Sequence, residues 1–152
     1  MTEPASLPST TARFALPLLF PGQSQREFAI NEALARCDAL LHASITGEAS
    51  TPPSNPAEGD VWLVIPNATG AFSGREGCIA VRALGQWTYI SPRDGMRIFD
   101  RASGRTLFYS NGWLRTDPIS LPLGGSTIDA EARAAIATIA EILQQSGIVP
   151  SI

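Results

Sequence analysis

Two stretches decide the fold: "CIAVRALGQWTYISP", residues 78–92, and "TLFYSNGWLRTD", residues 106–117. In each, a short apolar run meets a turn that contains glycine, and a tryptophan stands just after the turn. Short runs of this kind on both sides of a glycine turn are typical of β-hairpins. The strand-like period extends from residue 60 to residue 117. It predicts an antiparallel β-meander of about six short strands, near residues 61–65, 78–84, 87–91, 96–101, 105–110 and 113–116.

The two turns set the expected register of their hairpins. Asn111-Gly112 suits a type I′ turn, in which both central residues have positive φ. Gly85-Gln86 suits a type II′ turn, because its first central residue is glycine. Each tryptophan would then face the residue that precedes its turn, which is Leu84 in one hairpin and Ser110 in the other.

A helix is predicted before the meander. Ser24, followed three residues later by Glu27, forms a capping box, and Gly47 supplies a C-terminal stop. An apolar stripe at three- and four-residue steps lies between them and should face the core. It consists of Ile30, Ala33, Leu34, Cys37, Leu40, Leu41 and Ile45.

A second helix is predicted after the meander, starting near Ser126 and ending near Ser146. Its apolar residues follow a narrow heptad-like seam with isoleucine at several core positions, which suits self-association of three strands. An amphipathic helix docked on its own sheet is the alternative. The seam consists of Ile128, Ala132, Ala135, Ile139 and Ile142.

The first 23 residues contain four prolines, at positions 4, 8, 17 and 21, which favour an extended arm over a helix. The part "RFALPLLFPG", residues 13–22, is too apolar to stand alone in water, so it should lie on its own chain, on an identical neighbour or on another protein. We expect its apolar side chains to make the attachment: Phe14, Leu16, Leu18, Leu19 and Phe20.

The expected class is therefore α+β, with an extended arm over residues 1–23, a helix plus β-meander domain over 24–117, and a linker with a C-terminal helix over 118–152.

The 152 residues carry a net charge of −3 and no lysine, and the arginines are scattered. No nucleic-acid partner is expected from this pattern. The segment "FALPLLF", residues 14–20, is too short for a membrane span, so synthesis in the cytoplasm is expected.

The sequence offers little chemistry. His42 is the only histidine, and Cys37 and Cys78 stand far apart in apolar surroundings, so a metal site is not expected and both thiols are interpreted as reduced core residues. The chain lacks the motifs that mark nucleophilic hydrolases and nucleotide-binding enzymes. The carboxylates that could form a catalytic pair all fall in predicted turns or at strand ends: Glu58, Asp60, Glu76, Asp94 and Asp100. We therefore expect neither an enzyme nor a cofactor.

The aromatic residues of the hairpins have two interpretations. They can pack within a small sheet, or they can form an exposed platform that stacks on sugar rings or anchors a partner. The candidates for glycan or partner binding are Trp87, Tyr89, Tyr109 and Trp113. The exposure of these side chains distinguishes the two possibilities.

Two long segments resemble a known family. They are "ARFALPLLFPGQSQREFAINEALARCDALLHASI", residues 12–45, and "PAEGDVWLVIPNATGAFSGREGCIAVRALGQWTYISPRDGMRIFD", residues 56–100. They are similar to the phage-associated domain-of-unknown-function family, number 2793, found in prophage fibre and tail proteins and in head-spike proteins of gene transfer agents. The most specific elements are "LPLLFPGQSQREF", "PAEGDVWLV", "ATGAFSGREG" and "GQWTYISPRDGM".

This resemblance implies a virion structural protein: a trimer-forming module at the base of a spike or fibre, assembled into a phage or phage-like particle and supporting attachment to a host surface polysaccharide. Its partners would be two further copies of itself and other virion proteins. The family brings no catalytic residues. The chain ends soon after the second predicted helix, which favours an adaptor that joins a separate fibre to the particle. A carbohydrate-binding module that contacts glycan through exposed aromatic residues is the alternative.

Overall fold

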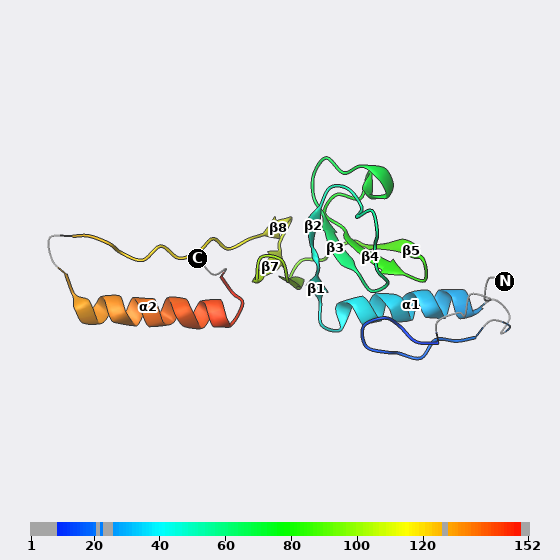
Figure 1. Ribbon diagram of the computed structural model, residues 1–152, viewed down its shortest axis with the longest axis horizontal. Helices are drawn as coiled ribbons and strands as arrows, with labels where there is room; N and C mark the ends of the chain where they lie inside the picture. The colour runs from blue at the N-terminus through cyan, green and yellow to red at the C-terminus, as the bar shows by residue number, and fades with distance from the viewer. Residues whose placement is uncertain (1–8, 21, 23–25, 126–127, 150–152) are drawn as a thin grey trace. The chain divides into compact units, whose positions relative to one another are not determined.

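The computed structural model describes residues 9–20, 22, 26–125 and 128–149, and it confirms the α+β class. The chain folds into two compact units, residues 1–92 and 93–152. All six predicted strands are present (Figure 1). The elements are α1 (Arg26–Leu40), β1 (Ser44–Ile45), β2 (Gly47–Ala49), β3 (Val61–Val64), the 3₁₀ turn η1 (Gly70–Phe72), β4 (Ile79–Ala83), β5 (Gln86–Ile90), β6 (Arg97–Asp100), β7 (Arg105–Tyr109), β8 (Trp113–Leu114) and α2 (Ala130–Gln145).

The first unit is built on a four-stranded sheet of order β2-β3-β4-β5. Strands β3, β4 and β5 form the predicted antiparallel meander, and β2 adds to its edge parallel to β3, with Gly47 beside Trp62. Strands β1 and β2 were not predicted from the sequence. They are only two and three residues long, and "GEAS" at residues 47–50 carries no apolar alternation that would mark a strand.

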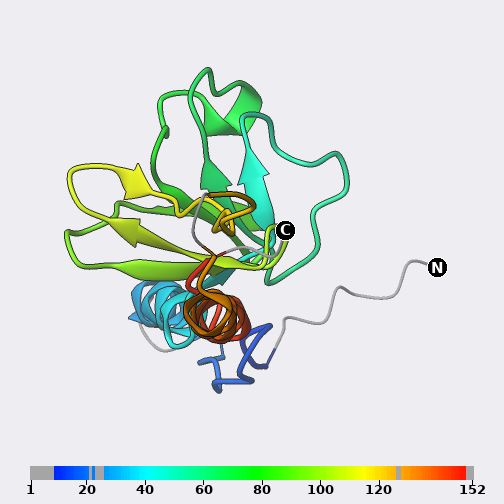
Figure 2. The same ribbon diagram turned by 90° about the vertical axis from the view of Figure 1, so that its left-hand side faces the viewer.

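Both faces of this sheet are covered. One face presents buried Leu63, Ile79 and Val81, and α1 contacts β4. On the other face, Phe72 of η1 is fully buried against Val64 and its neighbours. Figures 1 and 2 show α1 at one end of this unit and η1 at the other. The core is therefore filled from two sides by segments that are distant in sequence.

Helix α1 differs from its prediction in both length and orientation. It ends at Leu40, five residues before Ile45, which belongs to β1 and is fully buried there. The face that α1 buries carries Ala35, Asp38 and Ala39, whereas most of the predicted stripe, including Ile30, Cys37 and Leu41, is exposed. Cys37 is thus a free surface thiol and not a core residue. Ser24, the predicted N-cap, lies outside the described residues.

The buried face of α1 is more polar than the stripe because it binds the arm. Residues 9–18 form a tight loop in which Thr11 N donates to Leu16 O and Leu18 N donates to Ser9 O. Asp38, which is buried, accepts hydrogen bonds from Thr11 Oγ1 at 2.7 Å and from the backbone N–H groups of Arg13 and Phe14 at 2.9 and 2.8 Å. The described part of the arm therefore packs on its own chain (Figure 1).

The arm also caps the end of α1. The Arg13 guanidinium donates to the carbonyl oxygens of Ala39 and His42, at 2.8 and 3.0 Å, and to Ser44 Oγ at 2.8 Å. Carbonyl groups at a helix C-terminus lack intrahelical partners and carry partial negative charge, so a cation stabilises them. The cationic group that binds this end of the helix is Arg13, whereas the nearby His42 side chain is exposed and packs near the Phe14 ring.

The two turn predictions were wrong by one position. In the first hairpin Ala83 pairs with Gln86 and Arg82 with Trp87, so the turn residues are Leu84 and Gly85, with φ of 53° and 76°. Two positive φ values make this a type I′ turn. Trp87 consequently faces Arg82 and not Leu84.

In the second hairpin Tyr109 pairs with Trp113, which leaves three residues, 110–112, in the loop. Trp113 therefore faces Tyr109 and not Ser110. Asn111 has a φ of 52°, as the sequence predicts, and its N–H donates to Asp94 Oδ1 at 2.9 Å. That contact with a residue before β6 holds the longer loop, and it could not be seen from the turn residues alone.

The second unit contains the antiparallel strands β6, β7 and β8, followed by an extended segment and α2. Its small core includes fully buried Ile98 and Leu107, with Val149 from the segment after α2. This last segment is tied to the sheet, because Thr106 N donates to Gly147 O at 2.7 Å and Thr116 Oγ1 donates to Ile148 O at 2.6 Å.

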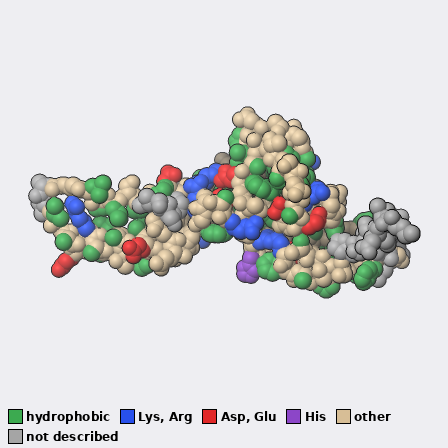
Figure 3. Space-filling model, in the orientation of Figure 1, with side chains coloured by type: hydrophobic (Ala, Val, Ile, Leu, Met, Phe, Trp, Pro, Cys, Tyr) green, Lys and Arg blue, Asp and Glu red, His purple; other side chains and the backbone are tan. Residues whose placement is uncertain are grey.

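Helix α2 begins and ends almost where the sequence predicts. Its N-cap is Asp129, whose side chain accepts from Ala132 N at 2.9 Å; Ser126, the predicted start, lies outside the described residues. Arg133 donates to Pro122 O and Gly124 O, which fastens the preceding extended segment to the helix. Among the residues of α2, Ala140 is the buried one, and green hydrophobic side chains are visible on its surface in Figure 3.

Candidate functional site

The predicted aromatic residues of the first unit, Trp87 and Tyr89, lie two apart on β5 and share one face of the sheet. Both are half-buried and meet Phe72 edge to face, with ring centroids 5.1 and 6.4 Å apart. Arg82 lies over the Trp87 ring at 5.8 Å and Arg75 over the Tyr89 ring at 4.9 Å. Each ring thus has an edge-to-face aromatic partner and a cation–π partner within the chain.

Tyr89 has further contacts. Its hydroxyl donates to the carbonyl oxygen of Ala71, which fastens η1 to the sheet. Burial raises the pKa of the Tyr89 phenol above its ordinary value of 10.0, and the positive charge of Arg75 partly opposes that rise. The group is therefore neutral at physiological pH and acts as a hydrogen-bond donor.

The other two predicted aromatic residues, Tyr109 and Trp113, belong to the second unit. They form a cross-strand pair with ring centroids 5.1 Å apart and an interplanar angle of 71°. Both are half-buried. The four candidates therefore form two separate pairs, one in each unit, and every ring already has an edge-to-face partner.

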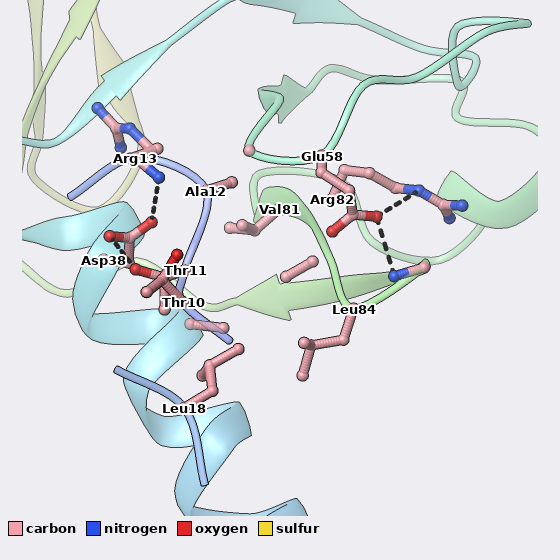
Figure 4. Close-up of a pocket in the computed structure, with 14 residues that line it drawn as sticks. Thr10, Thr11, Ala12, Arg13, Leu18, Asp38, Glu58, Val81, Arg82 and Leu84 are labelled. Atoms are coloured by element: carbon pink, nitrogen blue, oxygen red, sulfur yellow. Dashed lines mark hydrogen bonds and ion pairs between the residues drawn. The ribbon is translucent and has the colours of Figure 1, made fainter. Parts of the chain in front are cut away.

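A hollow of the first unit lies where the arm and α1 approach the tip of the β4–β5 hairpin (Figure 4). It encloses about 620 Å³ and is walled mainly by apolar side chains, among them Leu18, Val81 and Leu84. Asp38 lines it, but both carboxylate oxygens are occupied by the arm. We call this hollow the arm groove.

One charged pair borders the arm groove near the hairpin tip. Glu58 Oε1 accepts from Gly85 N at 2.9 Å and lies 3.7 Å from Arg82 Nε (Figure 4). Glu58 is exposed, so the pair is screened by water and contributes little stability. Its position instead orients the turn, because the carboxylate binds the N–H of a turn residue.

A second hollow, of about 340 Å³, adjoins the first and shares four residues with it, Leu18, Ala35, Ala83 and Leu84. We call it the acidic pocket. Its other lining residues are Leu19, Phe20, Glu27, Phe28, Asn31, Glu32, Gln86 and Thr88.

Glu27 distinguishes the acidic pocket from an ordinary surface hollow. Its side chain lies in the first turn of α1 and the residue is only 5% exposed. Oε1 accepts a long hydrogen bond of 3.3 Å from Gly22 N, and Oε2 is buried without a hydrogen-bond partner. The sequence identified Glu27 only as a capping residue. Nothing in the sequence alone indicated that one of its oxygens would be buried without a partner.

Leu84 is one of the residues that line both hollows. It has a φ of 53°, a conformation that asparagine or glycine adopts more readily at this position of a type I′ turn. Its side chain is 40% exposed and lines both hollows. Backbone strain at a partly exposed apolar residue is common at binding surfaces.

The predicted attachment arm is divided between inward and outward residues. Leu18 is buried and lines both hollows, and Leu16 and Leu19 are half-buried. Phe14 and Phe20 are exposed, Phe20 by 66%. Leu19 is further fixed to α1, because its N–H donates to Asn31 Oδ1 and its carbonyl oxygen accepts from Asn31 Nδ2.

The predicted oligomer seam is exposed along α2. Ile139 and Ile142 are 57% and 55% exposed, and Ala132 and Ala135 are exposed as well. Ile128, just before the helix, is also exposed. The four seam residues within α2, Ala132, Ala135, Ile139 and Ile142, therefore lie at heptad spacing and are exposed within the second unit.

Two further observations concern the described ranges as a whole. No group of three or more histidine, cysteine, aspartate or glutamate side chains there is arranged to hold a metal ion. None of the helices in those ranges has the length and hydropathy needed to cross a membrane.

Comparison with the curated proteins finds no match. A family model does match, over residues 30–114, which is more than half of the chain and includes most of α1, both hairpins and the strands between them. The protein therefore belongs to the family described as Protein of unknown function (DUF2793).

Proposed function

We propose that this protein is a structural module that assembles as a homotrimer through α2 and forms the base or adaptor of a spike or fibre on a phage or phage-like particle. The observation that carries the proposal is the exposed isoleucine seam of α2. A helix of 16 residues is only marginally stable on its own in water, and here Ala140 is its one buried residue. A partner surface must therefore stabilise it.

The seam itself favours identical partners. Its residues repeat at alternating steps of four and three, and isoleucine at both core positions of a heptad favours trimers. Three copies of α2 around one axis would bury the row that each copy leaves exposed. The seam carries no charged residue that would oppose a parallel arrangement.

The setting of a particle rests on the resemblance of the sequence to domains of prophage fibre and gene-transfer-agent spike proteins. In that setting the protein would be made in the bacterial cytoplasm and joined to other virion proteins, and the host surface polysaccharide would be bound by a fibre that it carries. The geometry of the aromatic residues favours this adaptor role over direct glycan binding, since both ring pairs are used for internal packing.

Light scattering after size-exclusion chromatography tests the proposal directly. At micromolar concentration the full chain should have the mass of a trimer. Ile139→Glu places a charge in the seam and should give a monomer. Ala134→Glu is the matched control, because it adds the same charge at an exposed position of α2 outside the seam, and it should remain trimeric. A monomeric wild-type chain would contradict the proposal.

A further inference from the structure

The acidic pocket combines a buried carboxylate with apolar walls. Glu27 is 5% exposed, and its Oε2 atom has no partner. A buried carboxylate oxygen without a hydrogen bond or counter-charge is strongly unfavourable, and proteins rarely retain one unless it has a use. Its other oxygen has a single bond, of 3.3 Å, at the long end of the hydrogen-bond range. The carboxylate thus has unused hydrogen-bonding capacity in a residue that lines the acidic pocket.

The charge of the pocket indicates what that ligand carries. Glu27 and Glu32 both line it, and none of the described residues around it is basic. Helix α1 carries two basic residues, Arg26 and Arg36; both are exposed, neither lines the pocket, and Arg36 pairs with Glu32 Oε1 at 2.7 Å. A cationic donor that enters the pocket would satisfy the buried oxygen and gain a charge-assisted hydrogen bond.

The walls indicate the shape of the rest of the ligand. Phe20 and Phe28 are 66% and 72% exposed at the mouth, and Leu18, Ala83 and Leu84 form the part shared with the arm groove. Arginine and lysine side chains bury their aliphatic stems against apolar surfaces while their charged ends bind an acid. A free small cation would fill the acidic pocket alone, whereas the connected arm groove offers room for the neighbouring residues of a polypeptide.

We propose that the acidic pocket binds an arginine or lysine side chain from an extended segment of a partner protein, with an apolar neighbour of that residue seated in the arm groove. Glu27 Oε2 accepts from the cationic group. Leu84, which is held at positive φ and lines both hollows, contacts the segment where it passes from one to the other. This site belongs to the first unit, and it does not depend on self-association through α2.

The probe is the blocked tripeptide acetyl-Leu-Arg-Leu-amide, titrated into the full chain and followed by NMR chemical shifts of the amides of residues 18–20, 27–35 and 83–88. The matched control peptide carries citrulline in place of arginine, which has nearly the same shape without the charge. The arginine peptide should bind at least about tenfold more tightly, because it alone supplies a charged donor. Equal binding of the two peptides, or no binding up to millimolar concentration, would overturn the proposal.

Two variants test whether Glu27 is responsible for the preference for the arginine peptide. Glu27→Gln retains an Oε1 acceptor for Gly22 but removes the charge, and it should abolish the preference for arginine over citrulline. It should also leave the melting temperature unchanged or raise it, because an unpaired buried charge is gone. Glu131→Gln, an exposed position on α2, is the control for net charge and should retain the preference. If Glu27→Gln lowers the melting temperature and leaves the preference intact, Glu27 is only a capping residue.

Two further outcomes would reassign the occupant. Benzamidine is a free cation with an apolar body, and binding of benzamidine as tight as that of the arginine peptide would show that the pocket takes small cations instead of a protein segment. Loss of oligomerisation in Glu27→Gln would show that an arginine of a second copy occupies the pocket. Either result would overturn the assignment to a partner protein.

Discussion

Two residues that line the hollows have a local preference that conflicts with their position. Leu84 adopts positive φ at a partly exposed turn position, and Glu27 buries an oxygen without a partner. Local sequence preferences predict the rest of the β4–β5 hairpin and fail at the turn, where Leu84 takes the place that asparagine usually fills. The sequence could not reveal this, because leucine at that position predicts a strand residue.

The strain at Leu84 can be measured by comparing two substitutions. Leu84→Ala and Leu84→Asn both remove the apolar side chain, but asparagine tolerates positive φ and alanine does not. We therefore expect Leu84→Asn to be more stable than Leu84→Ala by about 1 kcal/mol in urea denaturation. Equal stability of the two variants would show that the turn relaxes to another conformation. At Ala83, a regular strand position, the control substitution Ala83→Asn should be no more stable than the wild-type alanine.

Tyr89 provides a prediction on pH. Its folded-state pKa is raised, mainly by burial, so the folded protein holds the phenolic proton more tightly than the unfolded chain does. Its contribution to stability is therefore complete below the unfolded pKa of about 10, and it is lost as the pH rises through the folded pKa. The melting temperature should fall above pH 10, and Tyr89→Phe should reduce that fall. The same variant should be less stable at pH 7 by about 1 kcal/mol, because the bond to Ala71 O is gone.

At the scale of elements, the sequence predicted the positions of the strands far better than it predicted which face of α1 is buried. Each meander strand has apolar residues bounded by glycine or proline turns, and this local signal places all six within one or two residues of their observed ends. The helical stripe from Ile30 to Leu41 predicted the wrong buried face. The face that α1 does bury is selected by Asp38, whose partners come from the arm 24 to 27 residues earlier. Hydrogen bonds between residues this far apart leave no periodic pattern in the sequence of the helix.

The arm should therefore detach from α1 when Asp38 loses its carboxylate. Asp38→Ala removes three hydrogen bonds to residues 11–14 and should lower the free energy of unfolding by about 2–4 kcal/mol. Hydrogen exchange at the amides of Thr11 and Leu18 should accelerate more than exchange in β3 and β4. Glu32→Ala, which breaks only the exposed pair with Arg36, is the control and should change stability by less than about 0.5 kcal/mol. Unchanged exchange in the arm would show that Leu18 alone holds it.

At the scale of the whole molecule, the two units differ in how completely each buries its own apolar residues. The first unit has a core that includes fully buried Ile45, Leu63, Phe72 and Ile79. The second unit has a much smaller buried set and leaves the α2 seam exposed. Small cores are marginal, and association commonly supplies the missing stabilisation. The sequence predicted the seam residues, because heptad spacing is local, but not the division of the strands between two units.

This difference predicts that only the second unit depends on protein concentration. Hydrogen exchange measured at high and low micromolar concentration should accelerate on dilution in α2 and in β7, which is bonded to the segment after α2 through Thr106 and Gly147. Exchange in β3 and β4 should not change, because Val64 and Ala80 on these strands pack against Phe72 of the same unit. Ile139→Glu should reproduce the diluted pattern at every concentration. If hydrogen exchange accelerates in both units on dilution, the first unit also contributes to the oligomer. The second contact between copies would then lie on the exposed stripe of α1 that includes Ile30, Cys37 and Leu41.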